Sequence, residues 1–223
     1  MAQAPTLALD HLVVAASSLD HGLDWCDARF GIRPEAGGRH AAMGTHNRVF
    51  AIGSAHFARA YFEIIAIDPD APRPAQARWF DLDDAALQAR LAHGPRLVHW
   101  VARCTDIDAT LATLHAAGVD CGAVQAAERA TPHGLLRWRI SVRADGRRPL
   151  AGAMPALIEW AGAHPTDTLP DSGVALQALR VAGWPAPLAA ALLPSAIASD
   201  PRPGAPALHV ELIGARGPVI LES

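Results

Sequence analysis

Alternating apolar and polar residues run through many short stretches of the chain, and two longer stretches follow a helical pattern instead. Residues 9–15 (LDHLVVA) and 97–102 (LVHWVA) have the alternation of strands, in which successive side chains point to opposite faces. Apolar residues then recur at helical spacing over 19–30 and over 107–117, and a glycine follows each run. The pattern predicts a strand followed by a helix at two places in the chain.

The two strand-helix pairs are copies of one another. His11 and His99 occupy equivalent positions in their strands. Ser17 and Thr105 follow them at the same distance, where each is suited to cap the helix that begins there. A repeat of this kind indicates two equivalent structural units.

Strand patterns continue after each predicted helix. They cover residues 33–40, 47–52 and 60–67 in the first copy and residues 122–129, 135–143 and 156–161 in the second. Each copy is therefore predicted to be a β-α-β-β-β module, which makes the chain an α+β protein.

The same patterns divide the chain into four parts. We expect a first module at 1–67, a connector with one short helix at 68–96, a second module at 97–163 and an incomplete β-α-β-β unit at 164–223. Prolines at the start of the connector and a polar, proline-bearing stretch after residue 163 mark the boundaries.

Composition excludes several classes of function. The 19 basic and 22 acidic residues give a net charge of -3, which provides no basic surface for nucleic acid. All basic residues are arginine, so lysine Schiff-base chemistry and lysine-dependent phosphate loops are excluded. The motifs G-x-G-x-x-G, G-x-S-x-G and H-E-x-x-H are also missing.

The cellular setting follows from other features of the sequence. No apolar stretch reaches the roughly 18 residues that cross a bilayer, and the first ten residues lack the pattern of a signal peptide. Three cysteines without a C-x-x-C pair favour reduced thiols. We therefore expect a cytoplasmic protein whose partner is a small-molecule substrate rather than nucleic acid or a membrane.

One histidine or glutamate occurs in the first and in the last strand of each copy, with apolar neighbours on the opposite face. These residues are His11, Glu63, His99 and Glu159. Two modules packed face to face would bring the four side chains together in one cup. Two histidines and two glutamates suit a divalent ion such as Zn, Ni, Fe, Co or Mn. Taken singly, each of the four could equally be a hydrogen-bonded interior residue or a residue facing solvent.

A second polar cluster lies between two predicted strands of the first module. It consists of His40, Thr45, His46, Asn47 and Arg48. These side chains could orient a polar substrate. The alternative is a simple turn in which Gly44 bends the chain.

The chain resembles the vicinal-oxygen-chelate superfamily, and within it the glyoxalase-like group, over residues 8–162. The resemblance rests on residues 9–14 (LDHLVV), 37–40 (GGRH), 44–48 (GTHNR), 61–65 (YFEII) and 157–160 (LIEW). It implies paired β-α-β-β-β modules whose metal ligands lie on the first and fourth strands of each module. Those positions are again His11, Glu63, His99 and Glu159. The superfamily also includes proteins without metal. Dimers are common in it, although paired modules can complete a site within one chain, so we expect a monomer or a homodimer.

Three functions are compatible with this resemblance. The first is a metal-dependent lyase or isomerase, in which Glu63 or Glu159 transfers a proton as general base. The second is a ring-cleaving dioxygenase with iron held by His11, His99 and Glu159, although Glu63 would crowd the oxygen site. The third is a non-enzymatic protein that binds a small molecule in a metal-free cup.

Overall fold

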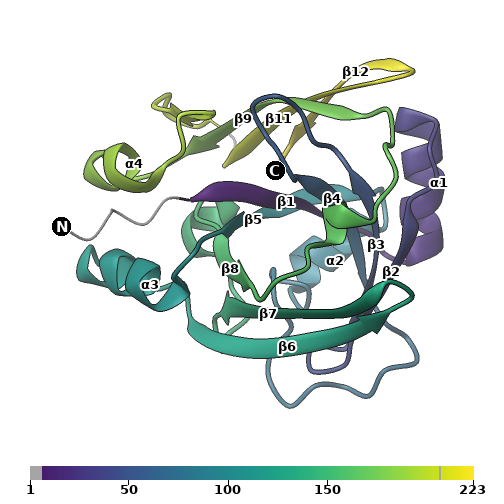
Figure 1. Cartoon of the computed structure of the whole chain (residues 1–223), viewed down its shortest axis with the longest axis horizontal. Helices are drawn as coiled ribbons and strands as arrows, with labels where there is room; N and C mark the ends of the chain where they lie inside the picture. The colour runs from purple at the N-terminus through teal and green to yellow at the C-terminus, as the bar shows by residue number, and fades with distance from the viewer. Residues whose placement is uncertain (1–6, 206) are drawn as a thin grey trace.

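The computed structural model describes residues 7–205 and 207–223, which form an α+β protein with two sheets (Figure 1). The first module consists of β1 (Ala8–Ala15), α1 (Leu19–Phe30), β2 (Glu35–His40), β3 (Thr45–Ala51) and β4 (Tyr61–Ile67). The second consists of β5 (Arg96–Arg103), α3 (Ile107–Ala116), β6 (Ala123–Thr131), β7 (Gly134–Val142) and β8 (Ala156–Trp160). The connector between them carries α2 (Ala85–Leu91).

The two modules join edge to edge in one eight-stranded sheet. Its strand order is β2-β3-β4-β1-β5-β8-β7-β6, with β1 antiparallel to β5 at the centre. In each module the first strand pairs in parallel with the fourth, β1 with β4 and β5 with β8. The repeated topology confirms the expected fold of paired β-α-β-β-β modules.

The last part of the chain forms a separate four-stranded sheet. Its elements are β9 (Ala175–Ala182), α4 (Ala186–Leu192), β10 (Ile197–Asp200), β11 (Leu208–Gly214) and β12 (Gly217–Glu222). Strand β10 was not expected, because four residues with a single large apolar side chain have no recognisable alternation. The unit therefore has five elements, but its order β10-β9-β11-β12 differs from that of the modules.

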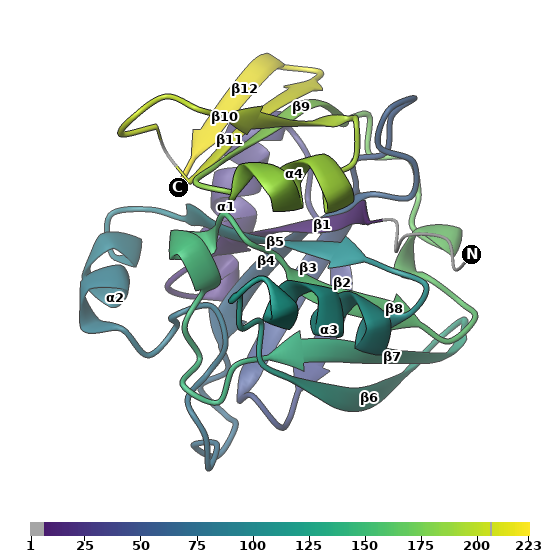
Figure 2. The same cartoon turned by 90° about the vertical axis from the view of Figure 1, so that its left-hand side faces the viewer.

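The outer face of the large sheet is covered by α1, α3 and the C-terminal sheet (Figures 1 and 2). One apolar core joins them. It includes Leu12 and Phe62 of the large sheet together with Leu179, Val210 and Leu212 of the C-terminal sheet. The indole nitrogens of Trp100 and Trp184 both donate to the carbonyl oxygen of Ala153, at 2.8 and 2.9 Å. The C-terminal sheet is thus part of the same folding unit as the modules.

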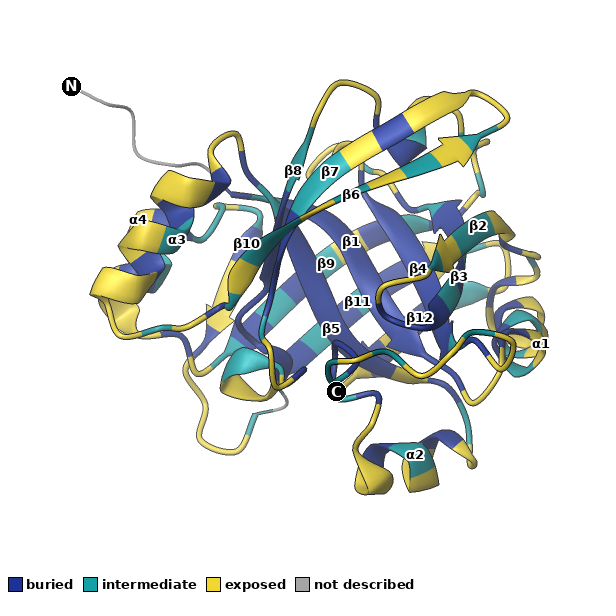
Figure 3. Ribbon diagram, turned by 90° about the horizontal axis from the view of Figure 1, so that it is seen from below, coloured by how far each residue is buried: buried dark blue, intermediate teal, exposed yellow. Residues whose placement is uncertain are grey.

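The inner face of the large sheet is partly filled by the connector. Trp79, Phe80 and Leu82 pack with α2 against apolar residues of β5 and β7. Phe80 and Asp81 have φ values of 60° and 59°, a left-handed backbone that is uncommon outside glycine. Arg148 holds this turn through a 2.7 Å contact with Asp81. The central strands are consequently buried on both faces (Figure 3).

No helix in the described part of the chain is long and apolar enough to cross a membrane.

Leu212 and Ile213 are neighbours on β11 that test the role of the C-terminal sheet. Leu212 is 1% exposed in the shared core, whereas Ile213 is 47% exposed. We expect Leu212→Ala to lower the free energy of unfolding by about 2–5 kcal/mol, and Ile213→Ala to have a far smaller effect. Urea unfolding, monitored both by tryptophan fluorescence and by circular dichroism, measures the free energy of unfolding of each variant. Two separate transitions would contradict a single core.

Candidate functional site

The inner face of the large sheet forms a small cavity of about 40 Å³, which is lined by residues of both modules. Its polar lining consists of His11, His40, Asn47, Tyr61, Glu63 and Arg129. Four aromatic side chains complete the wall, namely Trp79, Phe80, Trp138 and Trp160. A larger cavity of about 390 Å³ adjoins it and shares Val49, Arg129 and Pro165. We call the small cavity the cup and the larger one the vestibule.

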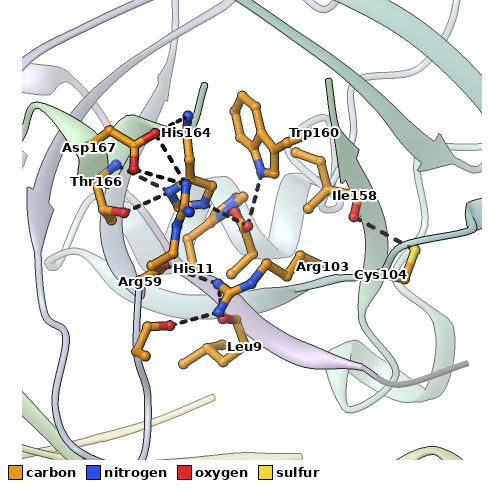
Figure 4. A network of polar contacts seen from close by, with 12 residues as sticks. Leu9, His11, Arg59, Arg103, Cys104, Ile158, Trp160, His164, Thr166 and Asp167 are labelled. Carbon is orange, nitrogen blue, oxygen red and sulfur yellow. Dashed lines mark hydrogen bonds and ion pairs between the residues drawn. The ribbon is translucent and has the colours of Figure 1, made fainter. Parts of the chain in front are cut away.

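A buried carboxylate, Asp10, supports one side of the cup. Its three side-chain partners, His11, Trp160 and His164, are labelled in Figure 4. Its Oδ1 lies 2.7 Å from Nδ1 of His11, and its Oδ2 lies 3.0 Å from both Nε1 of Trp160 and Nε2 of His164. Adjacent strand residues normally face opposite ways. Here the register of β1 against β5 shifts between Leu9 and His11, so Asp10 is the extra residue of a bulge and shares the His11 side.

The surroundings of Asp10 keep it ionised. Burial alone would raise the pKa of Asp10, but the hydrogen bonds from His11 and His164 outweigh burial and hold it well below its usual range. His164 is set up to donate, because the backbone N–H of Thr166 bonds to its Nδ1 at 3.2 Å and leaves the proton on Nε2. The carboxylate is thus a fixed negative charge beneath the cup.

The hydrogen bond with Asp10 also determines which nitrogen of His11 faces the cup. A carboxylate can only accept, so Nδ1 of His11 carries the proton in their hydrogen bond. The opposite nitrogen, Nε2, lies 3.6 Å from Oε2 of Glu63. The imidazole is held further by stacking on Tyr61, with ring centroids 4.5 Å apart. Nε2 of His11 and the Glu63 carboxylate therefore face one another at the cavity.

Glu63 is oriented from its other side by Asn47. The Asn47 amide nitrogen donates to Oε1 of Glu63 at 2.5 Å, and its oxygen accepts from the backbone N–H of Gly38 at 2.6 Å. These two hydrogen bonds require glycine at residue 37, since a Cβ there would lie 2.0 Å from the side-chain oxygen of Asn47. The glycine pair of the GGRH segment thus serves to position Asn47, which in turn holds Glu63 with its Oε2 facing His11.

Two further residues of the polar cluster lie on the same side. Nδ1 of His40 is 3.1 Å from the hydroxyl of Thr45, which is buried behind it, and the His40 ring meets Trp79 edge-on. Burial lowers the pKa of His40 to about 4, a net value in which Glu63 acts to raise the pKa and the charge of Arg129 acts to lower it. His40 is therefore a neutral hydrogen-bonding group at neutral pH.

A family model described as a glyoxalase-like domain matches residues 9–197. The chain belongs to the glyoxalase-like domain family. The match covers both modules and continues through α4, so the start of the C-terminal unit is part of the family's domain. A search of curated proteins finds no match.

Solved structures with related folds include a hypothetical protein from Staphylococcus aureus. It has a TM-score of 0.58 and 15% identity, covering 97% of this chain and 86% of the other. Methylmalonyl-CoA epimerase from Mycobacterium tuberculosis has a TM-score of 0.39 and 17% identity, covering 72% and 91%. The epimerase from Streptomyces coelicolor has a TM-score of 0.43 and 19% identity, covering 70% and 98%. At 15% identity, the S. aureus likeness shows the fold alone.

Within this glyoxalase-like domain, His99 does not join His11 and Glu63. It lines a different cavity of about 20 Å³, and Trp79 and Phe80 of the connector line both cavities and divide them. Nε2 of His99 accepts a hydrogen bond from the backbone N–H of Ala156 at 3.0 Å. Burial, followed by the charge of Arg148, lowers its pKa to about 3. His99 is a neutral interior residue.

Glu159 lies on the opposite face of the sheet, which corrects the expectation that it shares the cup. Its Oε2 accepts from the backbone N–H of Ile107 at the start of α3, at 2.8 Å, and lies 3.7 Å from Arg139. The alternation along β8 holds, but the face that carries Glu159 is the outer one. Ile158 and Trp160 resemble residues that pack against a helix, but they line the cup.

The polar cluster of the first module is also divided by strand alternation. His46 and Arg48 alternate with Asn47 on β3 and line a separate cavity beside the start of α1. His46 lies 3.9 Å from Asp68 there. Of the five expected substrate-binding residues, His40 and Asn47 line the cup, Thr45 supports His40, and His46 and Arg48 face away.

The donor set does not fit the four-ligand metal site that the family resemblance implies. Only His11 and Glu63 of the four share the cup. Among the residues that the structure describes, no three His, Cys, Asp or Glu side chains are grouped so that they could hold a metal ion. The bond from Asp10 to His11 would suit a metal-bound histidine, but a third protein donor is not in reach.

The sequence did not single out Asp10, His164, Arg129 or the aromatic wall. Asp10 stands next to His11 in the LDHLVV segment, and that adjacency was a usable signal. The sequence around His164 and Arg129 carries no such signal, because the contacts of these two residues are with distant parts of the chain.

Asp10→Asn tests the buried carboxylate. The change removes the charge that accepts from His11, Trp160 and His164, and we expect it to lower the free energy of unfolding by about 3 kcal/mol. Asp24→Asn is the matched control, because the Asp24 side chain is 81% exposed and its loss should cost less than about 0.5 kcal/mol. Denaturant unfolding of both variants at neutral pH measures the difference. Equal stabilities would show that Asp10 does not anchor the cup.

His99 makes stability depend on pH. The unfolded chain takes up a proton near the ordinary histidine pKa of 6.5, whereas folded His99 does so only near pH 3. Stability should therefore be complete above pH 6.5 and fall as the pH is lowered, by about 1.4 kcal/mol per pH unit for this residue. His99→Gln should reduce the slope of unfolding free energy against pH, and the exposed control His93→Gln should leave it unchanged.

Proposed function

We propose that this glyoxalase-like domain is an enzyme that transfers a proton at a carbon next to the carbonyl group of a small substrate. The observation that carries the proposal is the facing pair in the cup, with Oε2 of Glu63 3.6 Å from Nε2 of His11. Both side chains are held from behind, Glu63 by Asn47 and His11 by Asp10. Two positioned groups that exchange a proton are the basic requirement for this chemistry.

Each residue has a distinct role in the proposed reaction. Glu63 removes a proton from the substrate carbon, and the proton passes to Nε2 of His11. Asp10 stabilises the resulting imidazolium, as the buried carboxylate of a catalytic dyad does. The proton then returns to a neighbouring carbon or oxygen of the substrate, which gives an isomer and restores both groups.

The lining of the cup supports this chemistry. Aromatic side chains lower the polarity around the facing pair, and proton transfer from a weakly acidic carbon proceeds better where electrostatic interactions are less screened. A volume of about 40 Å³ admits only the reacting end of a substrate.

Nucleophilic catalysis has little support by comparison. Burial raises the pKa of Cys26 to about 12 and that of Cys104 to about 11, so neither supplies a thiolate at neutral pH. Burial, with the charge of Asp120, likewise raises the pKa of Cys121 to about 12. Ring cleavage by iron on His11, His99 and Glu159 has no support either, because these residues lie in three separate environments.

The aromatic wall favours a second candidate, a protein that binds a flat ligand without transforming it. The rings of Trp138 and Trp160 have centroids 5.5 Å apart beside the cup, a surface on which a planar ligand could stack. Such a binder would not depend on Glu63 as a base.

Glu63→Gln and Glu159→Gln distinguish these functions. We expect Glu63→Gln to slow the exchange of substrate C–H for deuterium by about 100-fold or more, and Glu159→Gln to stay near the wild-type rate. Proton NMR in D₂O with a panel of small carbonyl compounds measures the exchange. Glutamine at residue 159 keeps an oxygen that can accept from Ile107, so the fold of this variant should be preserved.

Other outcomes of these experiments would favour a different function. If Glu63→Gln and Glu159→Gln slow the exchange equally, the symmetric site expected from the repeat would be favoured. Ligand binding without exchange, unaffected by Glu63→Gln, would favour the non-enzymatic binder. Elemental analysis of protein purified without chelator tests the divalent metal, and near-stoichiometric metal lost on His11→Ala would contradict the poor fit of the donor set.

A further inference from the structure

Arg129 joins the two ends of the large sheet across the mouth of the cup. It lies on β6, one edge strand, and its guanidinium reaches Gly38 on β2, the other edge strand. A Cβ at Gly38 would lie 2.2 Å from Nη1 of Arg129, so only glycine leaves room for this contact. Figure 1 shows the β6-β7 hairpin running toward β2. Arg129 lines both the cup and the vestibule, and therefore stands at the passage between them.

The charge of Arg129 is not neutralised by the protein. Within residues 7–205 and 207–223, no carboxylate forms an ion pair with it, and its Nε is buried without a hydrogen-bond partner. The arginines of the neighbouring strand β7 differ. Arg137 pairs with Glu128 at 3.1 Å, and Arg139 pairs with Asp108 at 2.7 Å. A buried N–H without a partner is costly, which indicates that a ligand completes this site.

We propose that Arg129 binds the carboxylate of the substrate, so that the enzyme acts on small oxo acids. The carboxylate rests on the guanidinium at the passage, the carbonyl end enters the cup toward Glu63 and His11, and the remaining group lies in the vestibule. This inference rests on the proposed proton transfer, since it names the class of substrate for the same site.

The chemistry of the passage favours a carboxylate over other anions. A planar guanidinium matches a carboxylate with two parallel hydrogen bonds. Among the described residues that line the two cavities, Arg129 is the one arginine. The carboxylates of Asp10 and Glu63 lie deeper in the same site, and Glu35 and Asp167 line the vestibule, so a singly charged ligand fits better than a dianionic phosphate. The vestibule volume of about 390 Å³ is in the range of small-molecule sites.

Matched acids and esters test the proposal directly. The probes are phenylpyruvate and acetoacetate with their methyl esters, and binding is followed by quenching of the tryptophans that line the cup. Wild-type protein is expected to bind each acid about 10-fold or more tightly than its ester. Arg129→Gln should remove this preference and leave ester binding unchanged. Arg137→Gln is the control, because this arginine is exposed and pairs with Glu128.

Two further variants separate charge recognition from a structural role. Arg129→Lys keeps a cation and should retain part of the acid preference. Arg129→Ala leaves a space beside Gly38, and added guanidinium ion should restore acid binding to this variant with no effect on the ester. A purely structural arginine would change acid and ester binding alike. Circular dichroism and thermal melting check that each variant is folded.

The outcomes also separate this inference from the proposed function. Equal affinity of the wild type for acids and esters, binding of none of the acids, or a preference that survives Arg129→Gln would overturn the role of Arg129. A preference that depends on Arg129 without any C–H exchange would support the role of Arg129 and contradict the proton-transfer function. If C–H exchange proceeds equally with acids and esters and is unaffected by Arg129→Gln, the proton-transfer function would be supported and the role of Arg129 would be contradicted.

Discussion

The buried carboxylate of Asp10 is the interaction on which the site depends. It connects His11 of the first module, Trp160 of the second and His164 of the segment that follows, each within 3.0 Å. A charge without solvent is stable only where several donors meet it, so these three parts of the chain must come together for the fold to be favourable. The same requirement fixes the orientation of His11 and the position of one aromatic wall.

The duplicated modules use their equivalent positions differently. In the first module the strand positions hold His11 and Glu63 at an open cavity. In the second, the connector covers His99 with Phe80, and the ring centroids lie 5.0 Å apart. The left-handed backbone at Phe80 and Asp81 aims the aromatic pair into that half of the cup. In the proposed reaction, one half of a symmetric architecture therefore provides the chemistry, and the other half provides an apolar wall.

Local patterns predicted most of the fold, because strand alternation and helical spacing depend on neighbouring residues. The caps were expected one residue too early, since Ser18 and Asp106 cap the helices in place of Ser17 and Thr105. The strands and helices of both modules begin and end within about three residues of the expected positions. His11 and Glu63 were found by the same reasoning, since Leu12 and Phe62 opposite them are buried in the outer core. Glu159 was misplaced because alternation separates two faces without saying which one is inside. Trp160 has the size of a core residue yet belongs to the cup, where its indole bonds to Asp10.

Features that depend on distant contacts could not be predicted in this way. The bulge that turns Asp10 inward arises from the pairing of β1 with β5, and β10 is defined only by its pairing with β9. Arg129 stands on an edge strand whose sequence resembles an ordinary solvent-exposed hairpin. Its setting follows from the curvature of an eight-stranded sheet, which brings the edges β2 and β6 close enough for one side chain to span them. Closure by an arginine leaves a positive charge at the mouth of a cup that holds the Glu63 carboxylate. The proposed substrate complements both, with its carboxylate on Arg129 and its acidic C–H bond at Glu63.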